Sequence, residues 1–424
     1  MQRLNTWHGS GGFIVSAEMQ ELIDRTGFLP ADDGGSRLRS LYQRGTAKLD
    51  SRLLSDFAKC CFMGDLQAIK RAIEAGDAPD ILGSETPYQH GYATFVVRGA
   101  QNIIGTASST DQDHAATLKY LLDLGAPPNM PDIVGYTALH HACNSNPRPE
   151  LARILLEGGA DPNQQDHFGS VPLMGAFQND AVQLVDLLME HGASLDIKDG
   201  DGDTPDDFFI KAGPYITAAV QKWKRRRAGE RQPLDEKACS MCAKTDVELK
   251  FCAKCGSIRY CSKECQKTDW PRHKLDCVGF NAETTVTLKP HYEDIGRVLP
   301  TADVQRQKFG YPVPKQPKRN MRSMHIPNIR PGETKKLIIK VQVPFDMDLG
   351  VPQIEETGDL MVFDRKRSLV CRIRRQDDPE GYLRISRVIR AKGVGGAKAY
   401  FSAEMERTDR LVVKVSEVLA EQTF

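Results

Sequence analysis

Residues 239–277 read CSMCAKTDVELKFCAKCGSIRYCSKECQKTDWPRHKLDC, and this stretch decides how the middle of the chain folds. Seven cysteines and one histidine recur in it with the spacing Cys239-x2-Cys242-x9-Cys252-x2-Cys255-x5-Cys261-x3-Cys265-x7-His273-x3-Cys277. A C-x2-C pair brings two sulfurs onto one ion, and eight such ligands fill two tetrahedral zinc sites. The spacing alone permits interleaved or sequential pairing of the two sets.

The bulk composition supports a metal centre rather than a disulfide framework. The 424 residues carry a net charge of +1, with 27% charged and 40% hydrophobic residues, which is typical of a globular chain of two to four domains. No signal peptide or bilayer-length apolar run is present, so we expect an intracellular protein, cytoplasmic and/or nuclear. Clustered cysteines in a reducing compartment indicate metal binding.

The finger resembles a known zinc module. Tyr260, Trp270 and the run RYCSKECQKTDWPRHKLDC are hallmarks of the MYND family. That resemblance implies a cross-brace with two structural zinc ions. One set of ligands is then Cys239, Cys242, Cys261 and Cys265, and the other is Cys252, Cys255, His273 and Cys277. Both sets are closed, whereas a catalytic zinc keeps an open position.

The resemblance also implies a surface for short proline-containing peptides. Gln266 and Trp270 match family positions that help to line the peptide groove, while Ala253 stands where some members have a serine. The alternative for Trp270 is a core position between the zinc sites. The finger is neutral once two zinc ions and seven thiolates join its eight basic and five acidic side chains. We therefore expect protein partners and no sequence-specific DNA.

The first half of the chain is repetitive. Gly135, Gly169 and Gly202 recur at intervals of 34 and 33 residues, within segments such as DIVGYTALHHAC and ELARILLEGGADPN. This period and these letters resemble the ankyrin repeat, which implies an α-helical solenoid. We predict four repeats and a partial one over residues 55–221, after an N-terminal segment at 1–54.

The predicted hairpin tips of this array carry apolar and aromatic residues. The candidates for partner binding are Ile133, Val134, His167 and Phe168. Tip positions are usually polar, so adjacent apolar residues there indicate a contact. The alternative to an intermolecular contact is packing on the N-terminal segment or on the C-terminal domain.

A basic linker is predicted at residues 222–238. Lys222 and residues 224–227 form a compact basic run. This run indicates a nuclear localisation or phosphate-binding patch. The alternative is a solvated helix end, where cations interact favourably with the helix dipole.

The remainder divides into a proline-rich linker, 278–332, and an antiparallel β-rich domain of unknown family, 333–424. Residues 377–381, DDPEG, are predicted to be a turn between strands. The predicted strands are Leu337–Val343, Leu360–Phe363, Leu369–Ile373, Tyr382–Ile389, Ala399–Ala403 and Leu411–Val415. Residues 365–398 have a net charge of +8. That excess predicts either a solvated basic face or a site for an acidic protein or RNA.

The predicted fold is therefore multidomain: an ankyrin solenoid, a two-zinc MYND finger and a C-terminal antiparallel β domain. No SET-type, P-loop, G-x-S-x-G or H-E-x-x-H segment occurs, so we expect no enzyme. The leading hypothesis is an intracellular protein–protein interaction adaptor. The alternatives are a nuclear transcriptional co-regulator that recruits proline-containing peptides and an enzyme whose activity lies in the unassigned C-terminal domain.

Overall fold

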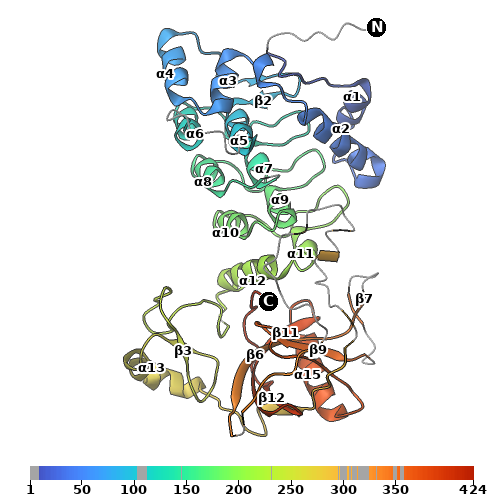
Figure 1. Ribbon diagram of the computed structural model, residues 1–424. Helices are drawn as coiled ribbons and strands as arrows, with labels where there is room; N and C mark the ends of the chain where they lie inside the picture. Colours follow the sequence, from blue (N-terminus) through green and yellow to red (C-terminus); the bar gives the residue numbers. More distant parts are fainter. Residues whose placement is uncertain are drawn as a thin grey trace. The chain divides into compact units, whose positions relative to one another are not determined.

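The computed structural model divides into two compact units, residues 1–212 with 306–312 and residues 213–305 with 313–424, which are described separately. The residues whose structure is described are 9–102, 112–144, 146–230, 232–294, 296, 303–304, 307, 313, 324–330, 332–346, 351–353 and 358–424. Figure 1 shows the order of the elements along the chain.

The N-terminal segment forms two helices, α1 (Ala17–Ile23) and α2 (Ser36–Thr46). The side chain of Ser16 caps α1 by accepting a hydrogen bond from Met19 N, which satisfies a donor that has no partner within the helix. A short helical turn precedes α2 at Ala31–Gly35, and another follows it at Ser51–Leu53.

The array consists of stacked helix pairs, which agree with the predicted repeat pattern (Figure 1). Described helices form four pairs and a short fifth element: α3 (Asp56–Met63) with α4 (Leu66–Ala75), α5 (Tyr92–Asn102) with α6 (His114–Asp123), α7 (Ala138–Cys143) with α8 (Pro149–Glu157), α9 (Pro172–Gln178) with α10 (Val182–Glu190), and α11 (Pro205–Phe208). A two-stranded ribbon, β1 (Ser84–Glu85) and β2 (His90–Gly91), precedes α5.

Three successive hairpins of the array are each built on one aspartate. The Oδ1 atoms of Asp132, Asp166 and Asp199 each accept hydrogen bonds from the backbone N–H groups two and four residues later, at 2.8–3.1 Å. The turn requires a positive φ at Gly135 (80°) and Gly169 (75°). A Cβ at either glycine would lie 2.8 Å from a backbone nitrogen of the following hairpin, so glycine is needed for the close stacking.

Asparagines join successive repeats at the ends of the second helices. Asn129 Nδ2 donates to Gly159 O at 3.2 Å, and Asn163 Nδ2 donates to Gly192 O at 3.1 Å. Each asparagine Oδ1 accepts a backbone N–H two residues beyond that glycine. These bonds satisfy backbone groups at the helix ends and fix the spacing between repeats.

The second unit begins with α12 (Pro214–Ala228), which runs across the boundary predicted at residue 221. The finger follows, with the hairpin β3 (Lys250–Phe251) and β4 (Arg259–Tyr260) and the helix α13 (Lys263–Asp276). Among the described residues, no helix is both long enough and apolar enough to cross a bilayer.

A six-stranded antiparallel sheet forms the C-terminal domain, in the order β10-β9-β6-β11-β12-β5. Its strands are β5 (Thr285–Leu288), β6 (Lys335–Gln342), β9 (Leu360–Asp364), β10 (Val370–Ile373), β11 (Lys398–Arg407) and β12 (Arg410–Lys414). β7 (Phe345–Asp346) and β8 (Val351–Pro352) form a separate ribbon. β5 lies within the stretch predicted to be a linker.

The predicted strand Tyr382–Ile389 is wrong, because these residues lie in α15 (Pro379–Lys392). Tyr382, Ile385 and Ile389 follow a helical spacing and are fully buried in the core beside the sheet strands. Asp378 caps the helix by accepting from Gly381 N, so the predicted turn at 377–381 leads into a helix instead of joining two strands.

The basic surface is consequently different from the one expected. Arg384 lies on α15 and donates to backbone carbonyls, including Thr285 O at 3.0 Å. Arg372 and Arg374 form ion pairs with Glu293. These three arginines therefore have partners within the domain and do not line one continuous basic sheet face.

Candidate zinc centre

The first set of metal ligands gathers where the finger hairpin meets α13. Cys239, Cys242, Cys261 and Cys265 have all four sulfurs within 4.8 Å of one another. The Cys261 sulfur lies 3.5 Å from those of Cys242 and Cys265. Ser262 caps α13 by accepting from Cys265 N, which places Cys265 in the first turn of the helix.

The second set is Cys252, Cys255, His273 and Cys277, and it is buried throughout. The Cys252 and Cys277 sulfurs lie 3.9 Å apart, and Cys255 Sγ lies 3.6 Å from His273 Nε2. The two sets interleave along the chain. This arrangement removes the sequential pairing that the spacing had left open.

The acidity of the thiols fits a bound dication. Burial opposes ionisation of Cys239 and Cys252, yet backbone N–H donors outweigh it and lower the pKa of each thiol to about 6. Burial, followed by the charges of Cys255 and Cys252, raises the pKa of Cys277 to about 12. Further thiolates are therefore costly without a cation, and zinc supplies the positive charge that lets all the thiols ionise.

Comparison with known protein families agrees with this geometry. Residues 239–277 match the model of the MYND finger, and residues 99–205 match the model of ankyrin repeats in three copies. The chain contains ankyrin repeats and a MYND finger. The expected resemblance, the multidomain fold and the two zinc sites are confirmed. Four protein ligands close each site, so the MYND finger uses its zinc ions structurally.

Individual relatives match limited parts of this chain. The SET domain and MYND-type zinc finger protein 6 of Schizosaccharomyces pombe is 50% identical over 54 residues, which are 13% of this chain and 11% of that protein. The E3 ubiquitin-protein ligase KEG of Arabidopsis thaliana is 27% identical over 177 residues, 41% of this chain and 10% of that protein. Neurogenic locus notch homolog protein 4 of Homo sapiens is 42% identical over 87 residues, 20% of this chain and 4% of that protein.

The matched parts therefore span about a tenth or less of these relatives. The family models identify two module types in this chain, ankyrin repeats and a MYND finger. Both modules are protein-interaction modules, and this is the functional statement that the comparisons support.

Trp270 lies on α13 with 41% of its surface exposed, beside the ring of His273 at a centroid distance of 5.8 Å. Gln266, one helical turn earlier, is partly exposed. Asp269 is a buried polar residue of α13. It accepts a hydrogen bond from Tyr260 at 2.7 Å and pairs with Arg272, and the contact with Tyr260 holds the helix on the finger. Trp270 is therefore available to a partner while it contacts a zinc ligand.

The second knuckle of the finger docks on the sheet. Lys336 Nζ of β6 donates to Ala253 O at 2.8 Å, and Ser402 Oγ of β11 donates to Gly256 O at 3.1 Å. Gly256 has φ = +68°, and a Cβ there would lie 3.4 Å from the Ser402 hydroxyl oxygen. The sheet thus satisfies carbonyl groups on the knuckle that carries two zinc ligands.

A buried lysine completes this junction. Lys414 of β12 is 2% exposed, and its Nζ lies 2.8 Å from Glu417 Oε2 and 3.3 Å from both Cys255 O and Ser257 Oγ. Ser257 also donates to Glu417. Sequence reasoning missed these residues, because nothing local marks a lysine that meets a partner about 160 residues away.

The four hairpin-tip residues lie beneath the N-terminal segment. Val134 and Phe168 are 0% and 1% exposed in one apolar cluster with residues of α1 and α2, and Ile133 packs against that cluster. His167 Nε2 lies 3.3 Å from Leu22 O. The structure therefore shows the hairpin tips packed on the N-terminal segment, which was the alternative to an intermolecular contact. Val134 and Phe168 are covered by the N-terminal segment and so are not exposed to a partner in this structure, and the partner-binding role of the tips stays a prediction.

The basic run at the end of α12 is partly used in ion pairs. Arg225 is buried and pairs with Asp235 and Glu421, each at 2.6 Å. Arg226 pairs with Glu236. Two of the five cations of the run are therefore held in ion pairs, and the buried Arg225 does not fit the solvated helix end given as the alternative.

Proposed function

We propose that this protein is an intracellular adaptor that joins two protein partners, one on the ankyrin array and one on the MYND finger. The observation that carries the proposal is Trp270, a large aromatic side chain 41% exposed on a finger whose two metal sites are closed. A closed metal site supports binding rather than catalysis. Joining two weak sites in one chain raises overall affinity through effective concentration.

The finger partner that fits is a short proline-containing peptide. Gln266 and Trp270 are four residues apart on α13, so they lie on one face of the helix. An aromatic plane offers a proline ring a large apolar contact, and a nearby amide donates to and accepts from peptide backbone. Ala253 lacks the hydroxyl that a serine would offer, and its carbonyl accepts from Lys336. Peptide preference at the second knuckle therefore depends on the sheet as well as on the finger.

Replacing Trp270 with alanine tests this site directly. We expect the affinity for a proline-containing peptide to fall about thirtyfold or more, because truncating a central aromatic anchor typically costs about 2 kcal/mol or more. Zinc content should remain unchanged, because Trp270 is not a ligand. Fluorescence anisotropy with the intact zinc-loaded protein measures the affinity.

Leu275→Ala is the matched control, because Leu275 is 78% exposed on the same helix and does not share the face of Trp270. It should bind the peptide like the unchanged protein. Equal losses for both variants, or none for Trp270→Ala, would remove the finger from the adaptor proposal.

A further inference from the structure

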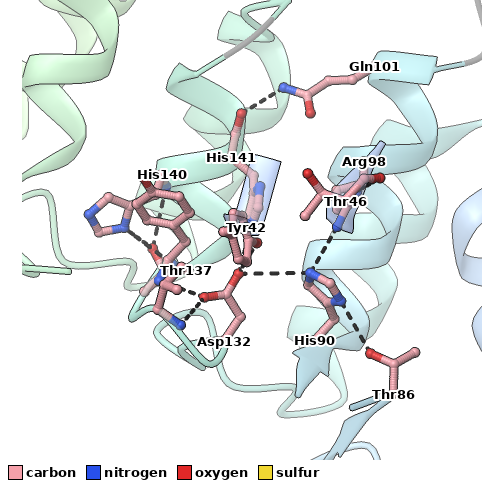
Figure 2. Close-up of polar contacts among 12 residues, drawn as sticks. Tyr42, Thr46, Thr86, His90, Arg98, Gln101, Asp132, Thr137, His140 and His141 are labelled. Carbon is pink, nitrogen blue, oxygen red and sulfur yellow. Dashed lines mark hydrogen bonds and ion pairs between the residues drawn. The ribbon is translucent and has the colours of Figure 1, made fainter. Parts of the chain in front are cut away.

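A buried polar cluster lies between α2 and the repeat array, in the unit without the zinc centre. Its members are Tyr42, His90, Arg98, Asp132 and His141, each less than a tenth exposed. Figure 2 shows these side chains gathered around Asp132. Sequence reasoning did not single them out, because the cluster joins four separate segments of the chain.

The carboxylate of Asp132 is the centre of the cluster. Its Oδ1 accepts from the backbone N–H groups of Val134 and Tyr136, both at 3.0 Å. Its Oδ2 accepts from the hydroxyl of Tyr42 and lies 3.2 Å from His141 Nε2. One aspartate thereby links α2 of the N-terminal segment to a hairpin and to α7.

Arg98 balances the charge of this aspartate. Its Nη1 lies 2.9 Å from His90 Nε2, and its Nη2 donates to the backbone oxygen of Thr46 at the end of α2. His90 Nε2 therefore accepts from Arg98, and its Nδ1 lies 3.3 Å from Thr86 Oγ1. With both imidazoles neutral, the arginine and the aspartate leave the cluster with no net charge.

His90, Asp132 and His141 also offer three ligand atoms within 4.8 Å of one another. A metal ion would need the His90 Nε2 lone pair that Arg98 already uses. It would also add two positive charges beside a buried guanidinium, without a further thiolate or carboxylate to offset them. The cluster is therefore a complete polar network, and we place no metal in it.

The network lies beneath an apolar cover. Phe13 stacks on Tyr88 with centroids 4.6 Å apart, and Tyr42 stacks on Tyr88 at 5.3 Å. Val134 and Phe168 of the hairpin tips are buried in the same cluster. Departure of residues 10–54 would expose Tyr88, Val134 and Phe168 on adjacent hairpins. An exposed apolar patch of this kind is typical of a protein-binding surface.

We propose that residues 10–54 are a displaceable cover over a protein-docking surface on the hairpin tips, locked by the contact of Tyr42 with Asp132 and released by acid. The partner that fits is an amphipathic helix, because α2 itself is the template: Leu38 and Tyr42 are buried four residues apart. This extends the array half of the proposed adaptor and does not depend on the peptide site of the finger.

Acid acts through the two imidazoles. A proton on His90 would place a second cation 2.9 Å from Arg98, and a proton on His141 would add buried charge beside it. Burial, then Arg98 and His141, lowers the pKa of His90 well below 6.5. Burial also lowers the pKa of His141, against the opposing effect of Asp132. The charged and titratable groups that face this pair are Tyr42, Tyr88, Arg98, Asp132, Tyr136 and His140.

The lowered pKa values of His90 and His141 determine how closure of the cover depends on pH. The closed cover binds fewer protons than the open one, so closure is fully stabilised above pH 6.5 and weakens as the pH falls below it. His140, with a pKa lowered by burial to about 4, acts in the same direction. Asp166, with a pKa raised by burial to about 7, acts in the opposite direction over the range from 7 to 3.8.

Hydrogen exchange of the full-length protein at pH 7.5 and pH 5.5, corrected for intrinsic rates, tests the release. Each histidine that titrates near 6.5 in the open state should contribute about a tenfold fall in protection of the α2 amides, so the fall in the unchanged protein should exceed that in a His90→Gln, His141→Gln double variant by about a hundredfold. Amides of α10 are the internal control. In the double variant only the opposing contributions of His140 and Asp166 should remain. Parallel changes in α2 and α10 would overturn the proposal.

Tyr42→Phe removes only the hydroxyl that locks the cover. It should lower α2 protection about tenfold or more at pH 7.5, because a hydrogen bond to a charged group is lost. Tyr120→Phe is the matched control in α6, outside the network. If Tyr42→Phe and Tyr120→Phe behave alike, the Tyr42 contact is not the lock.

The docking surface has a separate test. A labelled synthetic peptide of residues 10–54 should bind the full-length Tyr42→Phe protein more tightly than the unchanged protein at pH 7.5, and should bind it less tightly at pH 5.5. The same peptide with serine at positions 38 and 42 should not bind. An opened protein that does not bind the first peptide would overturn the docking surface.

Discussion

Replacing Cys252 with serine is expected to release about one of the two zinc ions and to unfold the finger, while the array keeps its helical signal. Cys252 lies in the buried second set, whose ligands come from the knuckle and from the end of α13. Structural zinc contributes on the order of 10–16 kcal/mol of apparent binding energy in zinc-finger peptides at neutral pH, more than so small an apolar core supplies. The array has its own core and lies in the other unit.

Elemental analysis and circular dichroism of the purified full-length variant measure the two effects. Cys60→Ser is the matched control, since Cys60 is only partly buried and belongs to neither ligand set. The control should keep two zinc ions per chain. A Cys252→Ser protein that keeps both ions would refute the ligand assignment.

Replacing Lys414 with methionine is expected to destabilise the C-terminal sheet by about 2–3 kcal/mol. The ammonium of Lys414 is buried and pairs with Glu417, and it also bonds the knuckle through Cys255 O and Ser257 Oγ. Methionine would leave Glu417 without its counterion, although the Glu417 side chain is 30% exposed and stays partly hydrated. Because these bonds hold the knuckle against β12, the same change should speed the loss of zinc to a chelator.

Thermal unfolding and zinc-release kinetics of the full-length protein measure these effects. Lys366→Met is the control, because Lys366 is exposed in the turn between β9 and β10. It should change stability by less than about 0.5 kcal/mol. If Lys414→Met leaves both the unfolding of the sheet and the rate of zinc loss unchanged, the finger and the sheet are independent.

The finger was the most predictable part of the chain, because zinc chemistry restricts its ligands to few residue types at short separations. The eight ligands follow from the spacing of cysteines and histidine alone. Their interleaving does not, because a C-x2-C pair has the same local geometry in either arrangement. The resemblance to the MYND family supplied the pairing, and the sulfur positions confirm it.

The repeat pattern of the array was predictable, but the burial of its hairpin tips beneath the N-terminal segment was not. The intervals between Gly135, Gly169 and Gly202 reflect a turn that is stacked with a fixed period. Whether Val134 and Phe168 face a partner or the chain itself depends on α1 and α2. That packing involves contacts more than 90 residues apart in sequence, which no local pattern records.

The C-terminal domain shows how two periods can coexist in one segment. Arg384, Ile385, Ser386 and Arg387 resemble an alternating strand when taken alone. Over the longer window, the buried residues Tyr382, Ile385 and Ile389 follow the helical period. The N-cap at Asp378 then marks the start of a helix. A four-residue window was too short to separate a strand from a helix.

The most direct test of the account is the zinc content of the purified full-length protein, measured by native mass spectrometry with and without a chelator. We expect two zinc ions per chain, and removal of both only with unfolding of the finger, since each ion is held by four protein ligands. A content of about zero or one zinc per chain would contradict it.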